Sequence, residues 1–275
     1  MKEDSYEDDN RLQKPGTLEV SHVSFAYPGG EKIYEDLSFL AAPGQIIGVT
    51  GAVACGKSSL GKTFLCEYPY EGRIRFHGKE LSEMTKAERT GMVGYLGHDP
   101  ELFNDTVRNN ILLGDDDDPE KYLKAVCFDG EVAEMEEGMD TIVGNGGVRL
   151  SGGQAQRLAL ARTLCHKRPV LILDDPFSAL DKNTEKQIFA NLKQQTKDNI
   201  VFLISHRLYL FPQMNQVIWM EDGKAVAGTH EEILEKIPEY RSLYETQSDE
   251  RENAKVETEN RKTVSEHTEE RRSGR

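Results

Sequence analysis

The chain has 275 residues, of which 37% are apolar, so it is long enough to bury a hydrophobic core as one large domain or two small ones. Its formal net charge of −14 disfavours sequence-independent nucleic-acid binding, because that kind of binding depends on a cationic surface. The longest apolar runs, such as Val170 to Leu173, are far shorter than the roughly 20 residues that cross a bilayer, so we expect no membrane insertion of this segment.

The two ends of the chain differ in composition from the middle. Residues 1–16 are polar and end in Pro15-Gly16, which predicts a linker. They lack the basic start and apolar stretch of a secretory signal, so we expect the protein to stay in the cytoplasm. Residues 248–275 are highly charged, which predicts a disordered tail. The cysteines have no paired metal-ligand spacing and are interpreted as reduced, structural thiols: Cys55, Cys66, Cys127 and Cys165.

Between these ends, residues 17–247 alternate strand-like and helix-like segments, the pattern of an α/β domain with a mostly parallel sheet. A strand-like run from Gln45 to Thr50 is followed by the sequence GAVACGKS and then by a helix-like run from Ser59 to Leu65. The eight-residue sequence fits the phosphate-loop pattern G-x-x-x-x-G-K-S completely. Small residues there let backbone N–H groups surround phosphates, and the helix N-terminus adds its positive dipole end.

This loop predicts binding of ATP together with Mg²⁺. Lys57 would neutralise the β- and γ-phosphates, and the Ser58 hydroxyl would ligate Mg²⁺. The residues predicted to contact the nucleotide in this loop are Gly51, Ala52, Val53, Ala54, Cys55, Gly56, Lys57, Ser58 and Ser59.

Two further motifs follow in chain order. The sequence LSGGQ, Leu150 to Gln154, opens a helix-like run that extends from Ala155 to Leu164. The sequence PVLILDD then reads as a buried strand that ends in Asp174 and Asp175. A carboxylate at the end of such a strand suits a metal site, so Asp174 is the second Mg²⁺ candidate. Asp175 would lie where a base or a water-positioning group is needed.

With these three motifs in this order, the stretch from Thr17 to Gln247 resembles the nucleotide-binding domain of ATP-binding cassette (ABC) transporters. The resemblance implies a phosphate-loop NTPase core, an antiparallel β subdomain and an inserted α-helical subdomain at about residues 99–168. It also implies that two cassettes close head to tail. The turn of one cassette then contacts the ATP bound to the other through Ser151, Gly152, Gly153 and Gln154.

Other positions match the family residue by residue. Tyr27 resembles the aromatic residue that stacks on adenine. The segment Ser178 to Asp181 is similar to the loop that crosses the dimer interface, and Asp181 is therefore a candidate nucleotide-site residue. His206 follows the strand-like run Ile200 to Ser205 and resembles the switch histidine that contacts the γ-phosphate.

The sequence also departs from the family pattern beside its own phosphate loop. The family's catalytic glutamate is here Asp175, whose side chain is shorter by about 1 Å, and a misplacement of that size can cost about 10²-fold in rate. His98 stands where the family has a glutamine that senses the metal and the attacking water. Histidine can ligate a metal or donate a proton, but it lacks the amide's paired donor and carbonyl, so His98 is both a catalytic and a metal candidate. Ala54 replaces a frequent glycine.

Because LSGGQ is intact, these departures resemble the degenerate half of a heterodimeric exporter. We therefore expect a different cassette as partner, an ATPase that is slow in isolation, and transmembrane domains on the same full-length chain or on a partner subunit. The segment Gly228 to Gln247 also resembles exporter cassettes, which places the domain at the cytoplasmic face of the cell membrane. Pro100, Leu102 and Phe103 are predicted to contact the membrane partner, or alternatively to form a satellite core.

Two other functions stay open. A regulatory clamp that closes on ATP without turnover is compatible with Asp175 and His98. A soluble cassette ATPase outside transport is disfavoured, because such proteins show paired cassettes, a long coiled-coil insertion or basic arms, and the sequence shows none of these. The transported substrate does not follow from this sequence.

Overall fold

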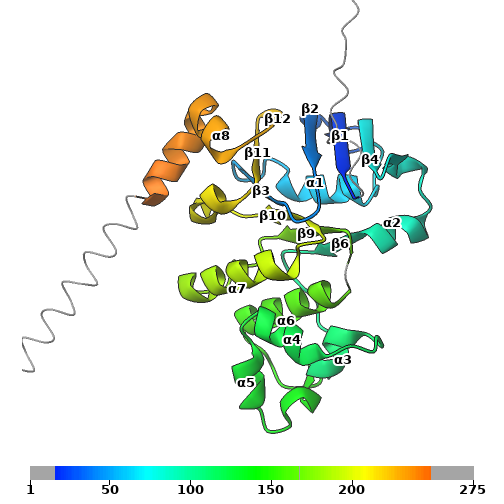
Figure 1. The fold of residues 1–275 in the computed structure, drawn as a ribbon, viewed down its shortest axis with the longest axis vertical. Coiled ribbons are helices and arrows are strands. Elements are labelled where there is room, and N and C mark those ends of the chain that lie inside the picture. Colours follow the sequence, from blue (N-terminus) through cyan, green and yellow to red (C-terminus); the bar gives the residue numbers. More distant parts are fainter. Residues whose placement is uncertain (1–15, 167, 249–275) are drawn as a thin grey trace, which may run out of the picture.

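The computed structural model describes residues 16–166 and 168–248. The predicted linker apart from Gly16, and the predicted tail apart from Ser248, lie outside the described residues. Within them, the chain forms an α/β fold around a ten-stranded sheet, with the strand order β5-β4-β1-β2-β12-β11-β3-β10-β9-β6 (Figure 1). This fold confirms the predicted class.

Five neighbouring strands form the parallel part of the sheet. In spatial order they are β11 (Gln216–Glu221), β3 (Ile46–Gly51), β10 (Ile200–Ile204), β9 (Val170–Asp174) and β6 (Val93–Leu96). Every residue of β3, β9 and β10 is buried, as expected for parallel strands covered on both faces. Ile204 lies opposite both Asp174 and Val49, so the ends of these three strands meet at one edge.

The antiparallel part continues the same sheet and confirms the predicted antiparallel β subdomain. It consists of β5 (Lys79–Glu80), β4 (Glu71–Phe76), β1 (Leu18–Ala26) and β2 (Lys32–Ala41), joined to the parallel part by β12 (Gly223–Gly228). The 3-10 turn at Leu81–Glu83 and helix α2 (Lys86–Met92) connect this part to β6.

A group of helices lies beyond the parallel strands, away from the antiparallel part of the sheet, in the lower half of Figure 1. It contains α3 (Val107–Leu112), α4 (Pro119–Ala125), α5 (Asp129–Ala133) and α6 (Gly152–Cys165), with a 3-10 turn at Gly138–Asp140 and the short pair β7 (Asp105–Thr106) and β8 (Ile142–Val143). The helices after the LSGGQ and DD motifs are α6 and α7 (Lys182–Gln195). The chain then forms a 3-10 turn at Leu208–Gln213, α8 (His230–Lys236) and helical residues 238–248. None of the described helices combines the length and apolar character of a bilayer span.

Helices α1 (Lys57–Phe64) and α6 pack in two different hydrophobic cores. Phe64 of α1 packs in one core with Ile172 of β9 and with residues of the antiparallel part, whereas Leu171 of β9 and the apolar side chains of α6 belong to the other core. Since side chains alternate along a strand, successive residues of β9 face opposite cores. The phosphate-loop helix and the LSGGQ helix therefore cover opposite faces of the sheet (Figure 1).

Several predicted boundaries differ from the structure. The strand expected at Ile200–Ser205 ends at Ile204, and the helix expected at Ala155–Leu164 spans Gly152–Cys165. The strand expected at Gln45–Thr50 is observed at Ile46–Gly51, and the helix expected from Ser59 begins at Lys57. The helix begins earlier because the last residues of the phosphate loop already form its first turn.

Candidate nucleotide site

The phosphate loop surrounds its own lysine. The Lys57 ammonium is buried and donates hydrogen bonds to the carbonyl oxygens of Ala52, at 2.6 Å, and Gly51, at 3.2 Å. Its carbon chain extends from the first turn of α1 back across the loop, which starts at the end of β3. The cation is thus fixed at the centre of the backbone segment that the sequence predicts to bind phosphate.

Glycine is required at two positions of this loop. A Cβ atom at Gly51 would lie 1.9 Å from the carbonyl oxygen of Met220, and one at Gly56 would lie 2.0 Å from Cγ2 of Ile33. Both residues have positive φ, 149° and 94°. Ala54 adopts a left-handed conformation at φ 62°, which strains a residue with a Cβ atom. The loop therefore holds Ala54 in a conformation that favours glycine.

Tyr27 lies beside the first turn of α1. Its hydroxyl is 3.0 Å from the Ser59 hydroxyl, and its ring contacts Phe25 and Tyr68 edge-on, each at a centroid distance of 5.1 Å. The side chain is half-buried. The structure thus places an aromatic ring next to the phosphate loop, while its stacking on adenine stays a prediction.

Asp174 ends β9 as a buried carboxylate that is 5% exposed. Its Oδ2 accepts a hydrogen bond from the Tyr95 hydroxyl at 3.1 Å. Burial and the Asp174 charge raise the pKa of Tyr95, so this phenol stays a donor. The sequence reasoning did not identify Tyr95, because no local pattern connects β6 with β9. The oxygen donors of Asp174 and Ser58 are of the kind that Mg²⁺ prefers, so these residues fit the predicted metal.

Asp175 follows in a left-handed conformation, at φ 49°, and its backbone is fixed on both sides. Its N–H donates to Ile204 O at 2.9 Å, and its carbonyl accepts from Gln156 Nε2 at 2.8 Å. The side chain, 16% exposed, places Oδ2 4.0 Å from Nδ1 of His98. Burial raises the pKa of Asp175, and the charges of His206, His98 and Arg207 oppose this rise.

His206 lies two residues after the end of β10 and interacts electrostatically with the same group. Burial and the positive charge of Lys57 lower its pKa, while Asp175 and Asp174 raise it. The structure therefore brings Lys57, Asp174, Asp175, His98 and His206 together, and we call these residues with Gly51–Ser58 the nucleotide edge. The predicted contacts of its members with ATP and Mg²⁺ stay predictions.

The LSGGQ sequence, which we call the signature turn, lies at the N-terminus of α6. Ser151 Oγ accepts from the Gln154 N–H at 3.3 Å, and Gln154 Oε1 accepts from the Ser151 N–H at 2.8 Å, so the two residues cap the helix reciprocally. Gly153 is required because a Cβ atom there would lie 2.8 Å from Ala179 O. Ser151 and Gly152 are exposed, so their backbone is accessible to a ligand from outside the chain.

Gln156 connects the signature helix to the nucleotide edge, and the sequence reasoning missed it. Besides its bond to Asp175, its Nε2 donates to Ser178 Oγ at 3.0 Å, and its Oε1 accepts from the Ala179 N–H at 3.3 Å. Gln156 shares a helix face with Leu160 and Leu164, so a polar residue in line with apolar ones was the available signal. Asp181 caps α7 by accepting from the N–H groups of residues 183 and 184, and its contact with nucleotide stays a prediction.

Comparison with known proteins identifies the family to which this arrangement belongs. Residues 34–178 match the ABC transporter family, which is more than half of the chain. The chain belongs to the ABC transporter family.

The chain is similar to proteins named as a multidrug resistance ABC transporter, a lipid A-core flippase and an ABC exporter. The cassette is 37% identical over 243 residues to the probable multidrug resistance ABC transporter ATP-binding/permease protein YheI of Bacillus subtilis, with 86% of this chain and 42% of the relative covered. It is 36% identical over 240 residues to the ATP-dependent lipid A-core flippase of Burkholderia thailandensis, with 84% and 40% covered. A solved bacterial Atm1-family ABC exporter with ATP bound matches with a TM-score of 0.78 and 29% identity, over 86% of this chain and 43% of that one. The cassette thus spans about two-fifths of the length of these relatives.

The structure places the residues predicted to contact a membrane partner in different environments. Leu102 packs against the core, whereas Phe103 is 55% exposed and lies under the guanidinium of Arg162, 4.9 Å from its ring centroid. Leu102 therefore contributes to a main core and not to a satellite one, while Phe103 offers an apolar surface. Contact of Pro100, Leu102 or Phe103 with a membrane partner stays a prediction.

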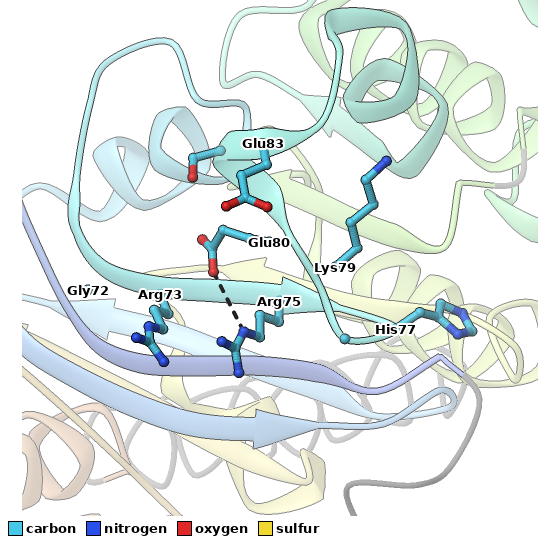
Figure 2. Close-up of a pocket in the computed structure, with 9 residues that line it drawn as sticks. Gly72, Arg73, Arg75, His77, Lys79, Glu80 and Glu83 are labelled. Atoms are coloured by element: carbon cyan, nitrogen blue, oxygen red, sulfur yellow. Dashed lines mark ion pairs between the residues drawn. The ribbon is translucent and has the colours of Figure 1, made fainter.

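A polar hollow at β4 and β5 lies outside the nucleotide edge (Figure 2). Two of its cations have acidic neighbours: Arg75 lies 3.8 Å from Glu80 and 3.9 Å from Glu19, and Lys79 lies 2.6 Å from Glu88. These pairs already satisfy Arg75 and Lys79, so neither cation supports an additional anion site.

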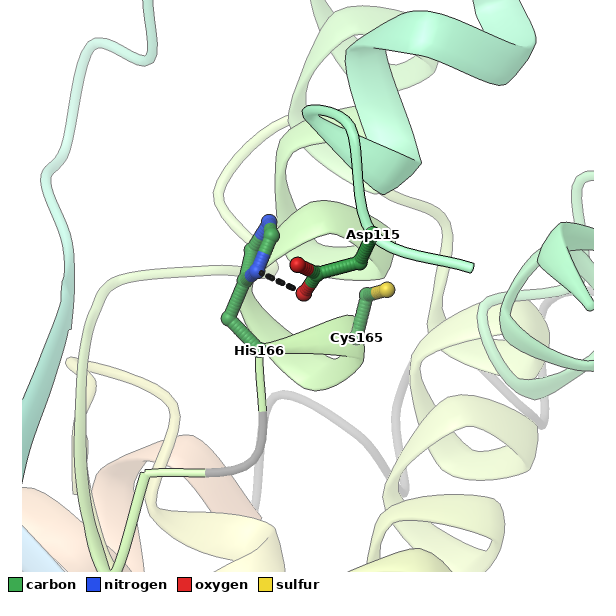
Figure 3. A group of neighbouring side chains, drawn as sticks. All are labelled: Asp115, Cys165 and His166. Carbon is green, nitrogen blue, oxygen red and sulfur yellow. Dashed lines mark hydrogen bonds and ion pairs between the residues drawn. The ribbon is translucent and has the colours of Figure 1, made fainter. Parts of the chain in front are cut away.

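A second polar group lies at the end of α6 (Figure 3). Nδ1 of His166 is 3.0 Å from Oδ2 of Asp115, and Cys165 is buried beside them. Burial raises the pKa of the Cys165 thiol, which favours the protonated form. All four cysteines are free, as the sequence predicted.

Proposed function

We propose that this cassette binds and hydrolyses ATP to power transmembrane transport, through ATP-driven closure of two cassettes. The phosphate loop, the carboxylates after β9 and the signature turn support this function, as does similarity to proteins named as exporters and flippases. The additional length of those relatives supports transmembrane domains, on the same full-length chain or on a partner subunit, with the cassette at the cytoplasmic face of the membrane.

Each residue of the nucleotide edge has a distinct task in this proposal. The Lys57 ammonium, now bonded to loop carbonyls, binds and neutralises the terminal phosphates. Ser58 and Asp174 hold Mg²⁺, which supplies charge neutralisation of the phosphates when bound. Tyr95 fixes the Asp174 carboxylate from the side of β6. Tyr27 orients the adenine beside α1.

We infer that hydrolysis at this cassette's own site is slow. The observation that carries this inference is the fixed backbone of Asp175, which donates to Ile204 O and accepts from Gln156 Nε2. Because these bonds hold the main chain, a backbone shift does not readily compensate for the missing methylene, and the carboxylate stays short of the position a glutamate reaches. A displacement of about 1 Å is enough to reduce the rate by about 10²-fold.

His98 contributes to the same effect. Its Nδ1 lies 4.0 Å from Oδ2 of Asp175, and the charge of His98 opposes the rise that burial causes in the pKa of Asp175, which weakens this carboxylate as a base toward water. An imidazole cannot present an amide's donor and carbonyl together. The two substitutions therefore face each other within one site, where they weaken the general base and the metal-sensing position together.

The signature turn keeps its capping bonds and its exposed glycine, which supports an active role toward a partner's ATP. We therefore propose a heterodimer in which this cassette holds one ATP at a slow site and completes a fast site on a different cassette. A regulatory clamp without turnover is the second candidate, favoured by the same Asp175 geometry. ATP turnover by the assembled complex separates the two.

The test is ATP binding and steady-state hydrolysis by the purified chain over a range of protein concentrations, with Lys57→Ala as the blank. The proposal predicts tight Mg-ATP binding with turnover near the blank at every concentration. Robust turnover that rises faster than linearly with concentration would show a competent homodimer and would overturn the slow-site proposal. Absence of ATP binding would overturn the proposed function itself.

A further inference from the structure

The C-terminal helical residues 238–248 are anchored to the body of the cassette by Tyr240. This side chain is fully buried, its ring lies 5.7 Å from the Trp219 ring of β11, and its hydroxyl lies 2.7 Å from Nδ1 of His230 in α8. Leu243 also packs partly against the same core. The helix thus has a defined position relative to the sheet.

Gln247, near the end of this helix, bonds to the backbone that surrounds the switch histidine. Its Nε2 donates to the carbonyl of His206 at 2.8 Å, and its Oε1 accepts from the N–H of Leu208 at 2.9 Å. A primary amide can donate one hydrogen bond and accept another at the same time, whereas a carboxylate or an ammonium cannot. The two bonds fix the peptide groups on either side of Arg207, in a segment 205–208 that we call the histidine turn.

The opposite side of the histidine turn is fixed by Arg207. Its guanidinium donates to the carbonyls of Ser178 and Leu180, each at 3.1 Å, and lies 2.5 Å from Glu185, which is fully buried. Ser205 Oγ also accepts from the Arg207 N–H at 3.0 Å. The turn is therefore held between the segment Ser178 to Asp181, which we call the interface loop, on one side and the C-terminal helix on the other.

We propose that Gln247 is a positioning residue for His206, so that the C-terminal helix sets how well the cassette distinguishes ATP from ADP. This inference rests on the proposed function, in which His206 contacts the γ-phosphate. Because the amide bonds to the main chain of the turn and not to the imidazole, Gln247 fixes where the ring starts without taking part in the chemistry. Loss of the two bonds frees the turn, and the ring then contacts the γ-phosphate less often.

The test compares three variants of the full chain. Gln247→Ala removes the amide, Gln247→Met removes both bonds but keeps side-chain length and helix propensity, and Thr246→Ala is the matched control. The Thr246 hydroxyl donates only within its own helix, to Ser242 O at 2.8 Å, and its residue is exposed. Either Gln247 variant alone is sufficient if the other fails to fold.

The first measurement is amide hydrogen exchange in peptides that cover residues 205–210. We expect exchange in both Gln247 variants to be faster by about fivefold to tenfold, as for the loss of one hydrogen bond, and unchanged in Thr246→Ala. Unchanged exchange in the Gln247 variants would overturn the proposal. This measurement requires no nucleotide, so it stands even if the proposed function fails.

The second measurement is the Kd for ATP and for ADP, each with Mg²⁺. The proposal predicts that the Gln247 variants lose ATP affinity by about fivefold while ADP affinity stays within twofold of wild type, the size expected from one weakened polar contact. Equal weakening of both nucleotides, or of neither, would mean that Gln247 only supports the helix and would overturn the positioning role. If the wild-type chain bound neither nucleotide, the proposed function would fail, separately from the exchange result.

Discussion

The nucleotide edge and the signature turn of this cassette differ in how regular their backbone conformations and hydrogen bonds are. At the nucleotide edge, Ala54 and Asp175 occupy left-handed conformations, and the partly exposed Asp175 carboxylate lies 4.0 Å from a histidine. At the signature turn, Ser151 and Gln154 satisfy each other's backbone N–H groups. Of these two regions, the nucleotide edge carries the strained backbone and the mismatched side chains, whereas the signature turn, which would face a partner, is regular.

The largest expected effect concerns Lys57. Lys57→Ala should reduce ATP affinity by about 10²-fold, because it removes the charge at the centre of the phosphate loop. Equilibrium binding of ATP to the purified chain measures this, with Lys236→Ala on the exposed end of α8 as the control. An affinity loss below threefold would mean that the loop binds phosphate through its backbone alone.

An effect of comparable size, on stability, is expected where the nucleotide edge meets the interface loop. Arg207→Ala should lower the free energy of unfolding by roughly 3 kcal/mol, because it leaves Glu185 buried and without its counter-charge. Urea unfolding measures the loss. The double variant Arg207→Ala with Glu185→Leu should recover most of it, since the buried charge is then gone. A double variant no more stable than the single one would contradict this explanation.

A substitution in the signature turn should change the stability of the chain and not its affinity for ATP. Ser151→Ala removes the helix cap and should lower the free energy of unfolding by about 1 kcal/mol. ATP affinity of the isolated chain should stay unchanged, because α6 and α1 lie on opposite faces of the sheet. Ser242→Ala, whose residue lies exposed on the C-terminal helix, is the control. A fall in ATP affinity would remove the separation between the two regions.

The smallest expected effect is a gain. Ala54→Gly should raise the free energy of unfolding by about 0.5 kcal/mol, because the relief of left-handed strain exceeds the added flexibility of the unfolded chain. Thermal unfolding should show a Tm higher by about 1–2 °C. Ala52→Gly is the matched control and should lower the Tm, since residue 52 is not among those with positive φ. Equal effects of the two substitutions would contradict the strain at Ala54.

Local patterns predicted the parts of the site that lie within one segment. The phosphate loop, the signature turn and the Asp174–Asp175 pair were found from sequence because each is a strand end or helix start with fixed spacing. The start of α1 was wrong by two residues, since a motif gives no hydrogen-bond register.

Pairs between distant segments were not predictable in the same way. Tyr95 reaches Asp174 across 79 residues and Gln247 reaches His206 across 41, and neither pair has a spacing rule. Only the fold brings their strands and helices together. The conformation of Asp175 also required the structure, because its backbone bonds come from β10 and α6.

The most direct test of the slow site is single-turnover hydrolysis of ATP by the chain in excess over nucleotide, compared among wild type, Asp175→Glu and Asp175→Glu with His98→Gln. The account predicts a rate near the Lys57→Ala blank for wild type, a rise of about tenfold for Asp175→Glu, limited by the left-handed backbone, and a further rise for the double variant. Brisk hydrolysis by wild type, or no gain in either variant, would contradict it.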